Sequence, residues 1–243
     1  MMETGEVKQY TKYGVGEILL VTVGILIALQ INNWNSSKIL KQKEIIILQQ
    51  IKNELQLTLD TEINPAKAYY QKQDTLLKRV VKFYKNPDLD SPPGYNFGHS
   101  EILTLEDSLP DIFNVLFEWH FVINTSAFEN LKSVGMDQIT NDSLRVKIST
   151  IYSNVYPQIL LTSQRVIHFL EDQLRPLIND HYKLLQYRTQ HDLDYFRSNH
   201  PFINRINWLH RDRSWVLKTL NESIPRIEIL MKEIDQELKR LES

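Results

Sequence analysis

The hydrophobic pattern of this chain is dominated by one uninterrupted apolar run near the N-terminus, Ile18–Leu29. Alone, its length suits a signal-peptide core or a buried helix, but a helix over 13–35 spans about 33 Å, enough to cross the hydrocarbon core of a bilayer. Tyr13 and Trp34 lie at its two edges, where amphipathic rings favour the headgroup level. The pattern therefore predicts a transmembrane anchor over 13–35, preceded by a polar leader over 1–12.

Beyond the anchor, apolar residues recur at spacings of three, four and seven, which indicates amphipathic helices. Helices are predicted over 38–63 (nearly continuous with the anchor), 66–85, 104–121 (one or two short helices), 124–152 (two helices), 158–187 and 206–241. The stretch 86–101 is rich in turn formers and is predicted to be a loop. The sequence thus predicts an all-α fold, in which one N-terminal transmembrane helix continues into a long amphipathic helix and an antiparallel helical bundle domain over 36–243.

Prolines and capping residues set the expected helix ends. Kinks or breaks are expected at Asn64-Pro65, Pro157, Pro176, His200-Pro201 and Pro225. In the middle of the chain, Gly135 is expected to end a helix that begins at Thr125 or Ser126, and Asn141 to cap the next helix. The aromatic residues expected in the core are Phe113, Phe117, Trp119 and Phe121.

Composition narrows the function without naming it. The formal net charge of −2 and the pI near 6.4 give no basic excess, so no nucleic-acid partner is expected. The absence of cysteine excludes thiol catalysis, disulfides and thiolate metal sites. The sequence carries no HExxH, G-x-S-x-G, P-loop or dinucleotide-binding motif. We therefore expect a protein that is not an enzyme and needs no cofactor.

One face of the predicted anchor carries small residues and a carboxylate. Gly24 and Ala28 form a small-xxx-small pair, and Glu17 lies seven residues before Gly24, so all three fall on nearly one side of a helix. This face could mediate close helix–helix association in the membrane. The alternative is that Glu17 sits at the interface and that the small residues reflect ordinary glycine and alanine use in spanning helices.

The best metal-ligand spacing in the sequence is a weak one. His168, Glu171 and Asp172 are three and four residues apart, so on a helix their side chains could reach one metal ion. A di-metal bundle would carry Glu-x-x-His on two helices, and this sequence has no such motif. The alternative is a surface histidine beside solvated carboxylates, and no metal site is expected.

A basic and aromatic patch stands out near the C-terminus. Its members are Arg205, Arg211, Arg213 and Lys218, interleaved with Trp208 and Trp215. Such a patch could hold an anionic ligand, a peptide or lipid headgroups. The alternative is that the tryptophans belong to the core and that the arginines pair with acids such as Asp212 and Asp194.

Several sequence blocks point to a family. Three segments of the chain resemble the DUF6090 family, which consists of small single-span proteins of unknown function common in Bacteroidota. These segments are GEILLVTVGILIALQINNWN, SAFENLKSVG and ITNDSLRVKI. The resemblance implies a membrane-anchored, mostly helical protein with no established activity. Similar sequences carry a more basic leader, which implies a cytoplasmic N-terminus and a periplasmic domain. Here Glu3 and Glu6 depart from that pattern.

These observations lead to one main functional expectation. We expect a non-enzymatic, membrane-anchored helical interaction or sensor-like module, such as an accessory subunit of an envelope complex, in the inner membrane with the bulk of the chain periplasmic. Its expected partners are the lipid bilayer and either a second copy of the chain or another membrane protein. Two alternatives stay open: a metal- or cofactor-dependent helical-bundle enzyme that uses the region of His168, and a soluble helical adaptor that buries Ile18–Leu29.

Overall fold

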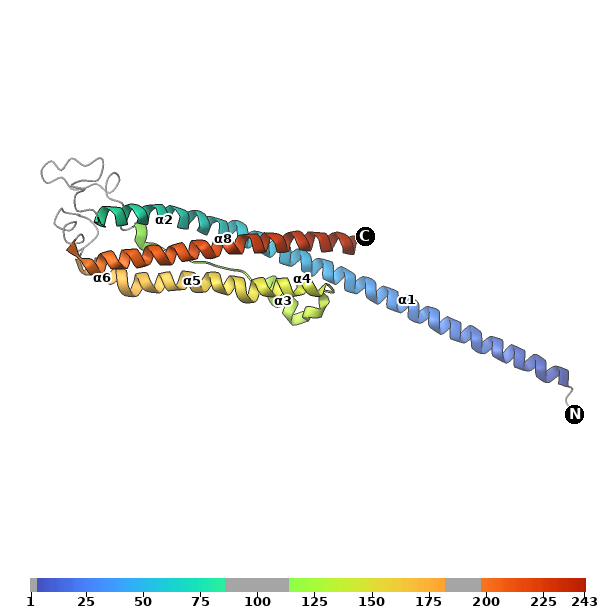
Figure 1. The fold of residues 1–243 in the computed structure, drawn as a ribbon. Coiled ribbons are helices and arrows are strands. Elements are labelled where there is room, and N and C mark those ends of the chain that lie inside the picture. Colours follow the sequence, from blue (N-terminus) through green and yellow to red (C-terminus); the bar gives the residue numbers. More distant parts are fainter. Residues whose placement is uncertain (1–3, 86–113, 182–197) are drawn as a thin grey trace.

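The protein is built from three long helical rods that lie side by side, with one of them projecting far beyond the others (Figure 1). The computed structural model describes residues 4–85, 114–181 and 198–243, and these contain helices and no strand. The prediction of an all-α fold is therefore confirmed. The predicted loop over 86–101 lies outside the described residues.

The first rod joins the predicted anchor to the bundle in one unbroken helix. It consists of α1 (Thr4–Thr58), a π-helical turn η1 (Leu59–Ile63) and α2 (Asn64–Lys85). Every side chain from 17 to 43 is exposed, and burial begins at Glu44. The N-terminal part of α1 thus stands alone, and the helix enters the bundle without a flexible linker.

The second and third rods complete the bundle. The second comprises α4 (Asp142–Thr150), η4 (Ile151–Val155), α5 (Tyr156–Phe169), η5 (Leu170–Leu174) and α6 (Arg175–His181). The third is the single helix α8 (His200–Glu242), which runs antiparallel to the other two and packs against α1, α2 and α5. Because α8 contacts both other rods, it is the helix that holds them together in the bundle.

A thin connection returns the chain from one end of the bundle to the other (Figure 1). It begins after the 3₁₀ turn η2 (Asn114–Leu116) beside α2, and it leads to α3 (Ser126–Val134) and the 3₁₀ turn η3 (Met136–Gln138). Residues 117–125, here called the return segment, have no regular structure. In place of the short helices predicted over 104–121, the described part of this range contains η2 followed by irregular backbone.

The caps predicted in the middle of the chain are confirmed. Gly135 follows α3 with φ of 108°, a backbone conformation that glycine adopts readily and other residues rarely do. Its N–H donates to the carbonyl of Leu131. The side chain of Asn141 accepts a hydrogen bond from the N–H of Leu144 at the start of α4.

At three prolines where a kink or a break is expected, the helix is not broken but carries a local π-helical turn. Pro65, Pro157 and Pro176 each follow a π-helical turn by two residues, and the helix continues through. The residue just before each proline donates its N–H to a carbonyl five positions back, as Asn64 does to Leu59. A proline ring clashes with the carbonyl four residues earlier, and the wider π turn moves that carbonyl aside.

The other two proline positions have opposite outcomes. Pro225 lies inside α8, which continues past it without interruption. The helix break expected at His200-Pro201 is confirmed: Ser198 is helical, Asn199 is not, and α8 begins at His200. Asn199 is its N-cap, and the proline lies in the first turn, where its missing N–H costs nothing. The closing helix therefore starts six residues before the predicted Ile206.

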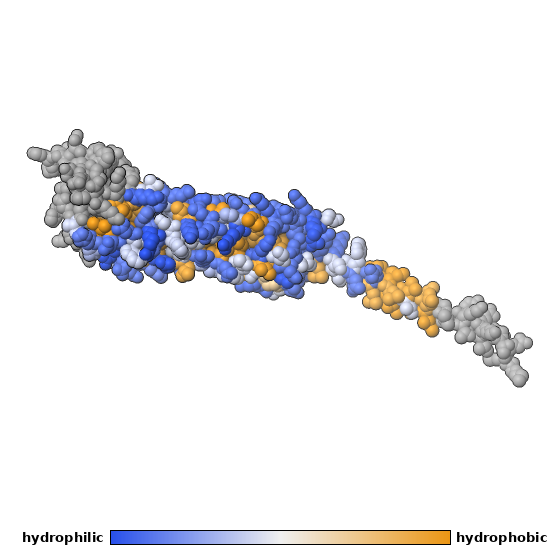
Figure 2. All heavy atoms as spheres, viewed as in Figure 1, coloured by the Kyte–Doolittle hydropathy of each residue, from blue (hydrophilic) through white to orange (hydrophobic). Residues whose placement is uncertain are grey.

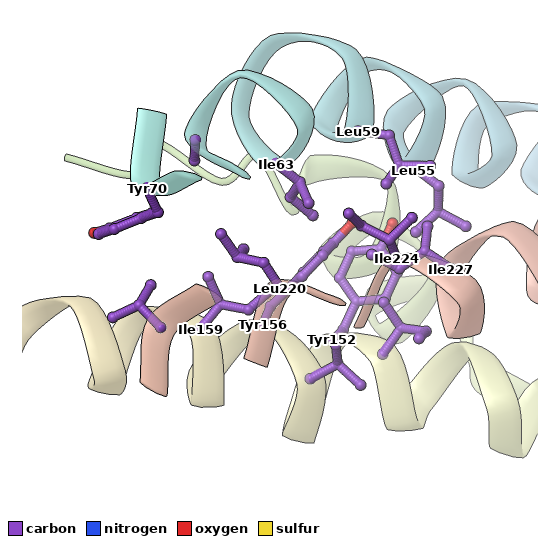
Figure 3. Packing of buried hydrophobic residues seen from close by; sticks show 14 of the residues in the cluster. Leu55, Leu59, Ile63, Tyr70, Tyr152, Tyr156, Ile159, Leu220, Ile224 and Ile227 are labelled. Atoms are coloured by element: carbon purple, nitrogen blue, oxygen red, sulfur yellow. The ribbon is translucent and has the colours of Figure 1, made fainter. Parts of the chain in front are cut away.

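The core is one continuous cluster between the rods (Figure 3). Leu55 and Ile63 from the first rod, Ile159 from α5, and Leu220 and Ile227 from α8 are all fully buried within it. Among the aromatic residues expected there, Trp119 and Phe121 pack against the cluster, Phe113 lies outside the described residues, and Phe117 is 66% exposed. The prediction for Phe117 is wrong because the return segment presents this side chain to solvent.

Candidate functional site

The free part of α1 is a rod of exposed apolar side chains. Ile18, Leu20 and Leu26 are 69%, 74% and 59% exposed, and Figure 2 shows an apolar band on the projecting helix beside a largely hydrophilic bundle. No part of its most apolar 18-residue window is buried in the protein. Within the described residues, α1 is the one helix that is long and apolar enough to cross a membrane, judged by length and composition.

The residues predicted to form an association face lie on this free rod. Glu17, Gly24 and Ala28 are all exposed, and a Cβ at Gly24 would meet no atom within 4 Å. Trp34 is 66% exposed, and the Nζ of Lys38 lies 5.7 Å from its ring centroid. Tyr13 lies on α1, and its side chain is outside the described set. The face is therefore open to a neighbouring helix.

Arg213 does not belong to the predicted surface patch. Its side chain is 1% exposed and forms an ion pair with Glu118, whose side chain is equally buried. Nε and Nη2 of Arg213 donate to Oε2 of Glu118 at 2.9 and 2.8 Å, and Nη1 donates to Oε1 of Gln73 at 2.9 Å. The assignment of Arg213 to an anionic-ligand site is thus wrong, because Glu118 of the return segment already serves as its anion.

Side chains from all three rods hold the return segment in place. Tyr70 on α2 donates to Glu118, Ser163 on α5 donates to the carbonyl of Trp119 at 3.2 Å, and Glu62 accepts from the N–H of Val122 at 3.1 Å. Burial raises the pKa of the Tyr70 phenol, and the nearby Glu118 carboxylate raises this pKa further. The return segment is therefore bound to the bundle by hydrogen bonds and is not a free loop.

Two buried carboxylates of α1 hold the region around α3. Glu54 accepts from the N–H of Ala127 at 2.8 Å and from the hydroxyl of Tyr152 at 2.7 Å. Glu44, 2% exposed, accepts from the N–H of Thr140 at 2.8 Å. These bonds satisfy two backbone donors, the N–H of Ala127 in the first turn of α3 and that of Thr140 just before the N-cap of α4. They also make the C-terminal half of α1 an integral part of the bundle.

A groove lies between α5 and α8 at the end of the bundle far from the N-terminus. Its volume is about 710 Å³, and its walls include Arg165, His168, Phe169, Arg205, Trp208 and Arg211. The guanidinium carbon of Arg211 lies 3.5 Å from the centroid of the Trp208 ring. The structure therefore brings part of the predicted patch together with residues of α5 that sequence reasoning did not connect with it.

Trp215 and Lys218 lie outside the groove walls. The Nζ of Lys218 is 4.9 Å from the centroid of the Trp215 ring. Trp208 and Trp215 are 51% and 52% exposed, so the alternative that both belong to the core is wrong. Both positions fall on the outer side of α8, whose buried face is occupied by neighbours such as Leu209 and Val216.

The weak metal candidates are not brought together as ligands. Across the described residues, no three histidine, cysteine, aspartate or glutamate side chains are arranged to hold a metal ion. Glu171 lies within ion-pair distance of Arg175, at 3.6 Å, while His168 lines the groove. Glu171 and Asp172 lie in the π-helical turn Leu170–Leu174, so the α-helical spacing that motivated this candidate does not apply.

Together, these features define a helical bundle carried on a single protruding apolar helix. Residues 17–78, which cover most of α1, η1 and most of α2, match the model of a family described as "Family of unknown function (DUF6090)". The resemblance inferred from the sequence is confirmed over this range. Neither a curated protein nor a solved structure matches the chain.

Proposed function

We propose that this chain is a membrane-anchored, non-enzymatic helical interaction module. The observation that carries the proposal is the exposed apolar half of α1, which has no partner surface in the described bundle. An apolar surface of this size is costly in water and favours a bilayer. The aromatic Trp34 and the lysine Lys38 at its end suit the headgroup level.

The continuity of the first rod supports a role in which the bundle is held at a fixed distance from the membrane. A helix that leaves the bilayer and enters a core without a flexible joint couples the two rigidly. The partner of the anchor, in this proposal, is a second copy of the chain or another membrane protein, which contacts the face of Glu17, Gly24 and Ala28. This arrangement suits an accessory or sensor-like subunit of an envelope complex.

For orientation, we propose an inner-membrane anchor with the bundle in the periplasm. The support is the more basic leader of similar sequences, which places the N-terminus inside. In this chain Lys8 and Lys12 precede the anchor, while Lys38, Lys41 and Lys43 follow it. The lysine count alone would favour the opposite orientation, with the bundle in the cytoplasm.

The deciding experiment combines membrane fractionation with protease access to the bundle in spheroplasts and in lysed cells. The proposal expects the chain in the membrane pellet and digestion of the bundle in intact spheroplasts. A pelleted chain that is protected until lysis would reverse the orientation. A soluble, monomeric chain would overturn the anchor and favour the adaptor alternative.

A matched variant makes this test specific to the apolar surface. Leu20→Arg with Leu26→Arg places two charges in the free rod, each costing about 2.5–3.5 kcal/mol at the centre of a spanning helix. Because both side chains are exposed, the bundle should stay folded. The double variant should therefore move to the soluble fraction with an unchanged far-UV circular dichroism spectrum.

A further inference from the structure

We propose that the groove between α5 and α8 binds a dissolved organic anion that carries a phosphate or carboxylate group on an apolar body. This site lies wholly within the second and third rods and does not involve α1, so it stands or falls independently of membrane anchoring. The charge, the hydrogen-bonding state and the shape of the groove each support the inference.

The groove has an excess of positive charge. Three arginines, Arg165, Arg205 and Arg211, line it together with a single carboxylate, Asp212. Asp212 lies 3.3 Å from Arg211 and 3.8 Å from Arg165, measured between guanidinium nitrogen and carboxylate oxygen. One carboxylate shared between two arginines leaves net positive charge.

Arg205, on the wall of the groove, has hydrogen-bond donors left unused within the described residues. Its Nη1 reaches the carbonyl of Pro201 at 3.3 Å, whereas its buried Nε has no hydrogen-bond partner among the described residues. Buried donors in proteins are normally paired, because an unpaired one has lost water without replacement. An anionic oxygen in the groove would accept from Nη2 of Arg205, which makes no hydrogen bond within the described residues, whereas the enclosed Nε is out of its reach.

The apolar part of the groove is large enough for an organic body. Phe169 is partly buried against the core, and Trp208 presents half of its surface. The stacking of Arg211 on Trp208 restricts the guanidinium before any ligand arrives, which lowers the ordering cost of binding. A volume of about 710 Å³ lies within the usual range for small-molecule sites.

The position of the groove favours a dissolved ligand over a lipid headgroup. His210, beside the groove on α8, contacts Asp74 on α2 at 2.9 Å. Roughly 40 residues of continuous helix separate Asp74 from Trp34, which corresponds to about 60 Å. Headgroups at the level of Trp34 are therefore far out of reach, so we assign the site to an anion in solution.

The test uses 1-naphthyl phosphate as a probe, with isothermal titration calorimetry on the full chain, held in zwitterionic nanodiscs if it fractionates with membranes and in buffer if it is soluble. We expect saturable binding at one site. Arg205→Gln and Arg211→Gln should each weaken it about tenfold, since each removes charge-assisted hydrogen bonds. Arg226→Gln, an exposed arginine of α8 outside the groove, is the matched control and should bind as the unaltered chain does.

Several results would overturn the proposal. These are no saturable binding up to about 1 mM probe, equal affinity for uncharged 1-naphthol, or unchanged affinity in both groove variants. Loss of probe binding on adding anionic lipid to the nanodiscs would show that headgroups occupy the site, which overturns the assignment to a dissolved ligand. Circular dichroism of each variant confirms that any loss of binding is not a loss of fold.

Discussion

Arg213 on α8 and Glu118 on the return segment form an ion pair in which each side chain is only 1% exposed. The pair is surrounded by further bonds, from Tyr70 to the carboxylate and from Arg213 to Gln73. A buried ion pair is favourable only when its remaining donors and acceptors are satisfied in this way. The ion pair fixes the return segment against α8.

Removing the arginine alone should destabilise the bundle strongly. Arg213→Met leaves Glu118 buried without its cation, and we expect a loss of about 3–5 kcal/mol in the free energy of unfolding. Denaturant titration followed by circular dichroism measures this loss. Arg226→Met, at an exposed position on the same helix, should change the free energy of unfolding by less than about 0.5 kcal/mol.

The double variant separates charge burial from packing. In Arg213→Met with Glu118→Met, no charge remains buried, so much of the stability lost in Arg213→Met should return. If the double variant were less stable than Arg213→Met, the ion pair would not be the dominant interaction at this position.

Gly135 should tolerate no side chain, and the reason is its backbone. At φ of 108° an L-residue is strained whatever the surrounding space, so Gly135→Ala should cost about 1–3 kcal/mol in the free energy of unfolding. An added Cβ would also meet the carboxylate of Asp137. Because that side chain can move, Asp137→Ala should not rescue Gly135→Ala. Rescue would mean that crowding, not backbone strain, is the cause.

The bundle should lose stability in alkaline solution. Burial raises the pKa of Tyr69 to about 12, and burial followed by the hydrogen bond to Glu54 raises the pKa of Tyr152. A phenol with a raised pKa in the folded state contributes stability that is fully present below its ordinary pKa of about 10. This contribution is lost as the pH rises above that value, because the unfolded chain releases the proton first.

Tyr152→Phe tests this linkage at a single residue. It removes one linked proton, so the fall of unfolding free energy above pH 10 should become shallower by about 1.4 kcal/mol per pH unit. At neutral pH the variant should be less stable, since Glu54 loses a hydrogen-bond donor. Denaturant titrations between pH 8 and about pH 12 give both quantities. An unchanged slope would show that Tyr152 ionises as freely when folded as when unfolded.

Enlarging the small-residue face should disturb association in the membrane without affecting the bundle. Gly24→Leu fills open space on the free rod, so stability of the bundle should not change. In a bilayer it should reduce cross-linking between chains, because close helix approach requires small residues. Thr22→Leu enlarges the opposite side of the same helix and is the matched control. Equal cross-linking in both variants would exclude this face as the contact.

The sequence predicts the helices well and their joints poorly. Periodic apolar positions and the caps at Gly135 and Asn141 are local signals, and the structure confirms them. Whether Pro65 breaks a helix depends on more distant contacts. Leu59 and Ile63, on either end of the π turn before it, are buried against other rods, and that packing keeps the helix continuous.

The groove and the ion pair depend on tertiary contacts that no local pattern reveals. Arg213 and Arg211 are two residues apart and equally basic, yet one is buried and the other is exposed. Their helical phase relative to Leu209 and Val216 places Arg213 toward the core, which a close reading of the α8 periodicity could have detected. Predicting that Arg205 and residues of α5 line the same groove would have required knowing how the second and third rods pack together.

In the proposed membrane-anchored state, the free helix between the apolar rod and the bundle sets both the distance of the bundle from the membrane and the direction that it faces. Residues 35–43 contact nothing else in the described structure that buries them, so residues can be added there without disturbing the core. Each added residue raises the bundle by about 1.5 Å and turns it by about 100°. Four residues therefore add about 6 Å with a turn of roughly 40°, whereas seven add about 10 Å and nearly restore the heading. The number of residues inserted can thus be chosen to change the distance of the bundle from the apolar rod with or without changing the direction that the bundle faces.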